Sequence, residues 1–211
     1  MGLTIVDSFS NVKRKIDNAI SKHMNQRIQK RRNKAEVQIK SYIRGWIEEQ
    51  PEVASLRTQG RLNSLNAQFG LPPGIPDIAI EEIIQALIAS VDVIFTKIDG
   101  KLRGGIEFRI HGSVILSILN IPQGIIITKK GVPLNWLQWL LTRGHETIVF
   151  GYKYTPYPEL GRSGGGTMTK GSVFRVEPHS FTGTVDDNFV TRAFSGRGRE
   201  LSRVLKVLLK G

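Results

Sequence analysis

Residues 161–195 read GRSGGGTMTKGSVFRVEPHSFTGTVDDNFVTRAFS, and this stretch decides the fold that the sequence predicts. It begins with a loop, Arg162–Gly166, because so many glycines do not hold one backbone conformation unaided. Apolar and polar residues then alternate over 173–176, as in a half-buried strand. Pro178 ends this strand, because proline has no N–H to donate. A helix over 184–195 is expected to follow.

The predicted helix over 184–195 has both a start signal and an apolar side. Thr184 is suited to be its N-cap, and Asp186 and Asp187 fall in the first turn, where carboxylates meet the positive end of the helix dipole. One apolar stripe is formed by Val185, Phe189, Ala193 and Phe194. We therefore expect the helix to dock on the sheet that contains the preceding strand.

Three parts of this stretch carry a family resemblance. They are Gly161–Gly164, the strand residues Phe174, Arg175 and Val176, and the set Gly183, Thr184, Asp187, Asn188, Phe189, Thr191 and Arg192. A flexible R-S-G-G loop before a basic strand and a G-T-x-D-N-F-x-T-R helix resemble the C-terminal half of the neck and tail-completion proteins of tailed bacteriophages. The rest of the chain resembles these proteins in outline.

The resemblance implies a function without catalysis. Proteins of this family are structural subunits that form rings at the head–tail junction of the virion. The resemblance thus implies a homo-oligomeric ring around the DNA passage, assembled in the host cytoplasm. Its partners would be other phage neck, portal-adaptor and tail proteins, with genomic DNA in the lumen as a non-specific contact. A tail terminator is the alternative within this class, and a stand-alone basic nucleic-acid-binding protein is the alternative from another class.

Composition sets wider bounds on the chain. Its 211 residues are 40% hydrophobic, which is enough for a core, and its net charge of +12 favours polyanions or an acidic protein as partners, unless it only solvates the surface. The absence of cysteine excludes disulfides and thiol chemistry. No uninterrupted apolar run approaches the ~18 residues of a membrane-spanning helix, so no membrane partner is expected. The basic run from Lys13 argues against a secretory signal.

Residues 1–49 are predicted to form one long basic helix. Apolar side chains recur along it at helical spacing: Val12, Ile16, Ile20, Met24, Ile28, Ala35, Ile39, Tyr42, Ile43, Trp46 and Ile47. At ~1.5 Å per residue such a helix is roughly 55–65 Å long, which exceeds what one domain of this size covers. We expect part of it to protrude and to pack on a neighbouring subunit.

The middle of this helix is strongly cationic. Residues 1–50 contain eleven Lys and Arg against five acidic residues, so they hold half of the net charge. The DNA-facing candidates are Lys22, Arg27, Lys30, Arg31, Arg32 and Lys34. They favour a salt-sensitive, sequence-independent contact with phosphates, or else they form a solvated helix face. Helical spacing spreads them around the axis.

The remainder divides into a linker over 50–77 and a core domain over 78–211 with a short basic tail. Gly70–Pro76 is expected to be a rigid spacer. Predicted elements of the core are a helix over 78–98, strands over 105–111, 125–128 and 147–154, a short helix over 133–141 and an amphipathic tail over 200–210. The predicted fold is α+β, with a small, mostly antiparallel sheet packed by helices and a long protruding N-terminal helix.

The sequence has no catalytic signature. The four histidines have no partner at helical spacing and lie in no metal-ligand motif: His23, His111, His145 and His179. No G-x-S-x-G marks a nucleophile, and the glycine loop lacks the spacing of a nucleotide-binding loop. We therefore predict no enzyme, no catalytic or metal-binding residue and no cofactor.

The glycine loop is instead predicted to be a subunit contact that becomes ordered on assembly, or a flexible hairpin loop. Arg162 is suited to a bidentate pair with a neighbour's carboxylate, and the tyrosines before it offer rigid amphipathic area. The predicted subunit-contact residues are Trp46, Tyr154, Tyr157, Arg162, Ser163, Gly164, Gly165 and Gly166.

Overall fold

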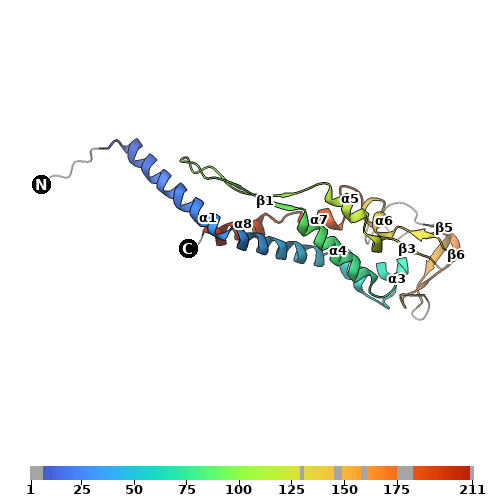
Figure 1. Cartoon of the computed structure of the whole chain (residues 1–211). Helices are drawn as coiled ribbons and strands as arrows, with labels where there is room; N and C mark the ends of the chain where they lie inside the picture. Colours follow the sequence, from blue (N-terminus) through green and yellow to red (C-terminus); the bar gives the residue numbers. More distant parts are fainter. Residues whose placement is uncertain (1–6, 129–130, 145–148, 158–160, 175–182, 210–211) are drawn as a thin grey trace. The chain divides into compact units, whose positions relative to one another are not determined.

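The computed structural model describes residues 7–128, 131–144, 149–157, 161–174 and 183–209 (Figure 1). As predicted, these residues form a mixture of helices and small antiparallel sheets with a long N-terminal helix. The chain divides into two compact units. Unit 1 comprises residues 1–41, 91–111 and 196–211, and unit 2 comprises residues 42–90 and 112–195. Both units are built from segments that are far apart in the sequence.

Helix α1, Phe9–Glu48, confirms the predicted N-terminal helix over those 40 residues. Ser8 begins it, because its carbonyl oxygen accepts the N–H of Val12 at 3.0 Å. Its buried residues in unit 1 include Ile28, Ala35 and Ile39, which share one face at helical spacing.

A β-hairpin completes much of unit 1. Strand β1, Val91–Thr96, pairs with β2, Gly105–Ile110, in an antiparallel register. The Asn25 side chain on α1 holds the start of the hairpin loop through two bonds: it donates to the Ile98 carbonyl oxygen at 2.9 Å and accepts the Ile98 N–H at 2.8 Å. Helix α8, Gly198–Leu209, also belongs to unit 1 and matches the predicted tail up to residue 209.

Strand β1 corrects the predicted helix over 78–98. The observed helix α4, Ile75–Ala89, ends before it, and Val91–Thr96 is extended. Val91 and Val93 are buried whereas Asp92 between them is exposed, which is the alternation of a strand. β-branched residues favour the extended form. A continuous apolar run fits the period of a helix and that of a strand equally well, so the predicted helix was too long.

The helices of unit 2 surround an apolar core. Besides α4, this unit contains α2 (Pro51–Arg57), α3 (Leu65–Phe69), α5 (Val114–Leu119), α6 (Trp136–Thr142) and α7 (Phe189–Phe194). A 3-10 turn covers Pro122–Gly124. Ile80, Ile83 and Ile84 of α4 are fully buried. Phe69 packs against Trp136 and Trp139 of α6 at ring-centroid distances of 6.0 and 5.7 Å.

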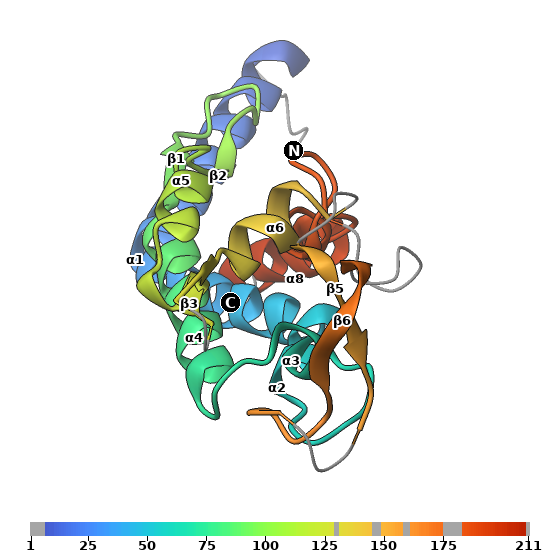
Figure 2. The same cartoon turned by 90° about the vertical axis from the view of Figure 1, so that its right-hand side faces the viewer.

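Two further sheets lie in unit 2, each two-stranded and antiparallel. Strand β3 (Ile126–Ile127) pairs with β4 (Pro133–Leu134), and β5 (Val149–Thr155) pairs with β6 (Thr167–Phe174). The single sheet that the sequence predicts is therefore three separate ones within the described residues. In both views β6 lies beside α3 (Figures 1 and 2).

Several predicted boundaries move. Helix α6 begins at Trp136 instead of 133, because Pro133 and Leu134 pair with β3. The predicted strand over 173–176 is the end of the longer β6, and residues 175 and 176 lie outside the described residues. Pro178, His145 and His179 also lie outside them.

The Arg44–Glu81 ion pair joins α1 to α4 within unit 2. The two guanidinium nitrogens of Arg44 donate to the two carboxylate oxygens of Glu81, both at 2.7 Å, and Gln85 donates to the same carboxylate at 2.7 Å. These bonds from Arg44 and then Gln85 lower the pKa of Glu81 to about 2. Both side chains are more than a third exposed, which limits the pair to about 0.2–1 kcal/mol.

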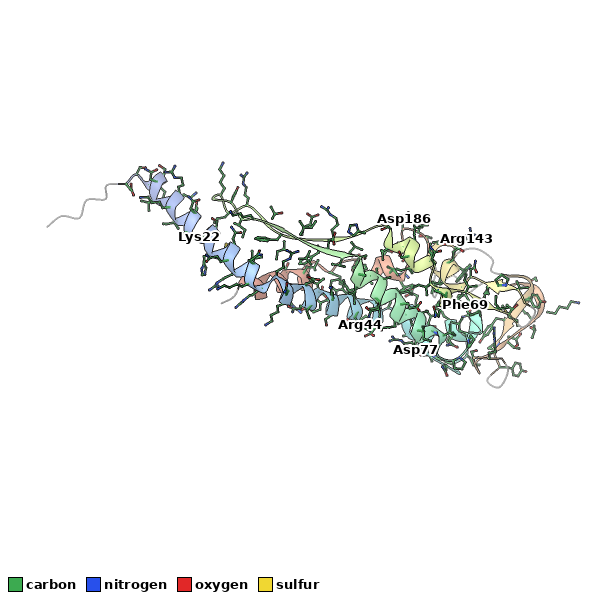
Figure 3. All side chains as sticks on the ribbon, viewed as in Figure 1. Lys22, Arg44, Phe69, Asp77, Arg143 and Asp186 are labelled. Atoms are coloured by element: carbon green, nitrogen blue, oxygen red, sulfur yellow. The ribbon has the colours of Figure 1, made fainter. Side chains whose placement is uncertain are left out.

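Stability should therefore depend on pH through Glu81. Its folded pKa is below the ordinary 4.5, so its contribution is fully present above pH 4.5 and is lost as the pH falls through about 2. The difference in urea midpoint between wild type and Glu81→Gln should accordingly shrink from pH 5 to pH 2. Asp186→Asn is the matched control, because the exposed Asp186 has no partner among the described residues (Figure 3). A difference for Glu81→Gln that stays constant over this range would contradict the assignment.

Candidate functional site: the cap cluster, the glycine loop and the cationic helix

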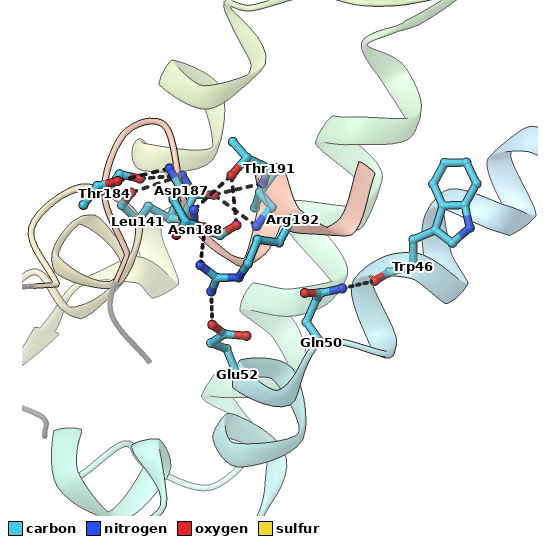
Figure 4. Close-up of polar contacts among 10 residues, drawn as sticks. Trp46, Gln50, Glu52, Leu141, Thr184, Asp187, Asn188, Thr191 and Arg192 are labelled. Carbon is cyan, nitrogen blue, oxygen red and sulfur yellow. Dashed lines mark hydrogen bonds and ion pairs between the residues drawn. The ribbon is translucent and has the colours of Figure 1, made fainter. Parts of the chain in front are cut away.

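Asn188 is the centre of what we call the cap cluster, formed by Glu52, Thr184, Asp187, Asn188, Thr191 and Arg192 (Figure 4). Asn188 as a whole is 1% exposed. The amide oxygen accepts the N–H groups of Val190 and Thr191 at 3.0 and 3.1 Å, and the amide nitrogen donates to the carbonyl oxygens of Thr184 and Leu141 at 2.9 and 3.2 Å. Asn188 thus caps α7 and ties its start to the end of α6.

The cap at Asn188 corrects the predicted helix start. Thr191 Oγ1 accepts the Asn188 N–H at 2.9 Å, which completes a reciprocal capping box. Thr184 caps a preceding turn instead, in which its hydroxyl accepts the Asp187 N–H at 3.1 Å. Asp186 and Asp187 therefore precede the helix, and Val185 is 63% exposed, outside the predicted stripe.

Arg192 links the cap cluster to helix α2. Its guanidinium donates to Asp187 at 2.7 Å and to Glu52, whose side chain is only 3% exposed. The second carboxylate oxygen of Glu52 has no hydrogen-bond partner among the described residues. A buried carboxylate is tolerated when a cation neutralises it, so Arg192 compensates the charge of Glu52.

The G-T-x-D-N-F-x-T-R motif therefore holds the chain's own fold together. Gly183 belongs to the same arrangement, because its carbonyl oxygen accepts the Gly144 N–H at 2.7 Å and an added Cβ would lie 1.7 Å from the Leu140 carbonyl oxygen. Among the described residues no group of three His, Asp or Glu side chains could hold a metal ion. Asn188 and Thr191 hydrogen-bond to each other, and Asn188 also bonds to Leu141 outside the motif, which matches a structural role.

One surface hollow of about 490 Å³ lies in unit 1. It is lined by Arg32, Glu36 and residues 91–95 of β1, and Arg32 donates to the Val93 carbonyl oxygen at 3.2 Å. Asp92 at its edge accepts a hydrogen bond from the His111 ring nitrogen Nε2 at 2.8 Å, and both side chains are more than half exposed. No serine, threonine or cysteine is among the residues that line the hollow.

The glycine loop is packed against the chain itself. Gly165 approaches the 61–67 segment so closely that an added Cβ would lie 2.5 Å from Ala67 Cβ. Tyr154 donates its hydroxyl to the Gly165 carbonyl oxygen at 2.7 Å and accepts the Asn63 N–H at 3.1 Å. These contacts hold the loop against its own chain, and the predicted contact with another subunit stays a prediction.

The other predicted subunit-contact residues differ in exposure. Arg162 is exposed and donates to the Ile127 carbonyl oxygen at 3.3 Å, and Tyr157 is 57% exposed. Ser163 is 6% exposed. Trp46 is 5% exposed, between Tyr42 and Phe194, so it has little surface left for another subunit. Gly164 and Gly166 lie within the packed loop, where Gly166 faces the Tyr154 ring.

The six cations predicted to face DNA fall into two groups. Lys22, Lys30 and Lys34 are exposed and have no ion pair among the described residues (Figure 3 labels Lys22). They lie on the side of α1 away from the buried Ile28 and Ala35, so they share one sector instead of spreading around the axis. The other three interact within the chain: Arg27, Arg31 and Arg32.

Sequence reasoning missed Glu52 and the central role of Asn188. The pattern N-F-V-T, with an N-cap residue three positions before a threonine, could have indicated the capping box. Glu52 gave no local signal, because its partner lies 140 residues away. None of the described helices is long and apolar enough to cross a membrane.

No protein-family model, curated protein or solved structure matches this chain.

Proposed function

We propose that this protein is a structural subunit of the head–tail junction of a tailed bacteriophage, a neck or tail-completion protein that forms a ring around the DNA passage. The observation that carries the proposal is the resemblance of Gly161–Arg192 to that family. The contacts made by the motif support it, because Asn188 and Thr191 cap α7 and Asn188 ties its start to α6. A motif of this kind is expected in a family that shares an architecture and no chemistry.

An uncovered apolar stripe on α1 supports assembly. Phe9, Ile16 and Ile20 are 86%, 52% and 39% exposed, and their spacing of seven and four places them on one face. Fully burying one such side chain contributes about 1.5–3 kcal/mol, so a second copy that covers the stripe would stabilise a ring. In this proposal α1 joins neighbouring subunits, and other neck, portal-adaptor and tail proteins bind the ring in the virion.

The stripe gives a direct test by sedimentation. Wild-type protein should sediment as a closed oligomer, and the double variant Ile16→Glu/Ile20→Glu should sediment as a monomer, because two buried charges at the subunit contact are strongly unfavourable. Val37→Glu is the control, since Val37 is 68% exposed on α1 but lies outside the stripe. Unchanged circular dichroism would show that the variants keep their helices. Wild-type protein that remains monomeric would contradict the ring.

The second candidate is a stand-alone nucleic-acid-binding protein, which the net charge of +12 favours. Such a protein should bind DNA tightly as a monomer or dimer at physiological salt. A ring subunit encloses DNA without having to hold it, so its affinity for free DNA should be low under those conditions. Sedimentation and DNA titration on the same sample separate the two, and a tail terminator is distinguished by binding to the tail end instead of the head.

A further inference from the structure

The positive charge of this chain is confined to one of its two units. Unit 1 contains 19 Lys and Arg against 7 Asp and Glu, whereas unit 2 contains 11 of each, so the whole net charge of +12 belongs to unit 1. Unit 1 is also the smaller unit. Its field therefore attracts anions strongly, while the charges of unit 2 largely cancel at a distance.

Helix α8 presents one cationic face. Arg199, Arg203 and Lys206 are exposed and follow one another at spacings of four and three, so they share a side of the helix. None of them has an ion pair among the described residues; the only acid of the helix, Glu200, pairs with Arg197 at 3.4 Å. Val204, on another side of α8, is fully buried.

Unit 1 also contains exposed lysines on α1 and on the hairpin. Lys22, Lys30 and Lys34 of α1 form no ion pair in the part of the chain that is described. The amino groups of Lys97 and Lys101 at the hairpin loop form none there either. A solvated surface of a stable protein usually intersperses both signs, as unit 2 does. Leaving so many cations unpaired in one unit is what a polyanion-binding surface requires.

We infer that unit 1 binds the phosphate backbone of double-stranded DNA independently of sequence, and that α8 contributes to this surface together with α1. The inference rests on the proposed function only for the presence of DNA. Residues 22–34 of α1 span about 18 Å at ~1.5 Å per residue, which faces roughly ten phosphates of a duplex carrying one charge per ~1.7 Å. Neither this segment nor α8 contains Phe, Tyr or Trp, so stacking on single-stranded bases is not available to them.

The test compares two triple variants with the same net charge. One removes the cations of α8: Arg199→Gln, Arg203→Gln and Lys206→Gln. The other removes three exposed cations of unit 2: Arg61→Gln, Lys153→Gln and Lys170→Gln. Affinity for a duplex of random sequence is measured by fluorescence anisotropy over a range of low salt concentrations. The two variants have equal net charge, so any difference between them reports where the DNA lies.

The affinity of the α8 variant for DNA should depend less steeply on salt than that of wild type. The slope of log K against log salt should decrease by about 0.9 for each cation that contacts phosphate, hence by up to about 2.7. If all three cations contact phosphate, raising the salt from about 50 to 200 mM should weaken DNA binding by a factor that is about 40-fold smaller for the α8 variant than for wild type. The unit 2 variant should retain the wild-type slope, and both should retain the wild-type circular dichroism.

Three outcomes would overturn the inference. Equal slopes for the two variants would mean that only total charge matters, and wild-type protein without affinity for the duplex at low salt would exclude the surface altogether. Equal or tighter binding of poly-glutamate at the same charge concentration would replace DNA by an acidic protein as the partner. Sedimentation of the same samples keeps the proposed function separate. If the protein forms a ring but the slopes of the two variants are equal, the inference fails and the ring remains; if the protein is a monomer with the expected slopes, the ring fails and the inference remains.

Discussion

Arg192→Met should lower the free energy of unfolding by about 3–5 kcal/mol, the loss expected when one partner of a buried ion pair is removed. The Glu52 side chain is 3% exposed, and one of its oxygens already has no partner among the described residues. Without the guanidinium of Arg192, its charge remains buried and uncompensated. Denaturation by urea, followed by circular dichroism at pH 7, measures the change.

The double variant Glu52→Gln/Arg192→Met isolates the cause. Neutralising Glu52 removes the buried charge, so the double variant should be more stable than Arg192→Met alone. Asp187→Asn serves as the control, because the Asp187 side chain is 69% exposed and its pairing with Arg192 is a surface contact worth about 0.2–1 kcal/mol. A double variant that is less stable than either single variant would show that lost packing, and not the charge, dominates.

Gly183→Ala should lower the free energy of unfolding by about 3 kcal/mol through overpacking. The added Cβ would lie 1.7 Å from the Leu140 carbonyl oxygen and 2.8 Å from its carbon, both of which belong to the backbone. The backbone cannot move away freely, because the Gly183 carbonyl oxygen accepts the Gly144 N–H and Thr184 bridges to Arg143. The same urea titration measures this loss.

Gly45→Ala provides the opposite expectation. Gly45 lies inside α1, and nothing is within 4 Å of its added Cβ. Alanine should therefore stabilise the protein by about 0.5–1 kcal/mol, since glycine loses more backbone entropy in a helix. Equal losses at positions 45 and 183 would contradict the steric explanation.

The sequence predicted the elements whose form depends on residues close together in the chain. The helix of α1 follows from a long apolar repeat uninterrupted by proline, and β2 follows from strict alternation. The boundary between α4 and β1 could not be found in the same way, because Val91, Val93 and Ile94 continue the apolar arc of the helix. Only pairing with residues 105–110 makes them extended.

The candidate site was less accessible to sequence reasoning. The glycine loop was recognised in the sequence. The need for glycine at position 165 comes from its close approach to Ala67, a contact between segments about a hundred residues apart that no local pattern indicates. Trp46 suggested an interface by its type and is instead covered by Tyr42 and Phe194. The prediction that the cations of α1 face DNA stays a prediction, and the grouping of Lys22, Lys30 and Lys34 on one side became visible only when Ile28 and Ala35 marked the buried face.

The discontinuity of both units has a consequence for synthesis on the ribosome. Unit 2 requires Phe189 and Arg192 to complete a core that begins at residue 42, and unit 1 requires α8 near the end of the chain. At about 5–20 residues per second, the nascent chain spends most of its elongation time with Ile39, Ile43 and Ile80 lacking their final partners. Chaperone occupancy during translation should accordingly persist until the last segment emerges, and a prematurely terminated chain should be degraded instead of accumulating as a smaller folded protein.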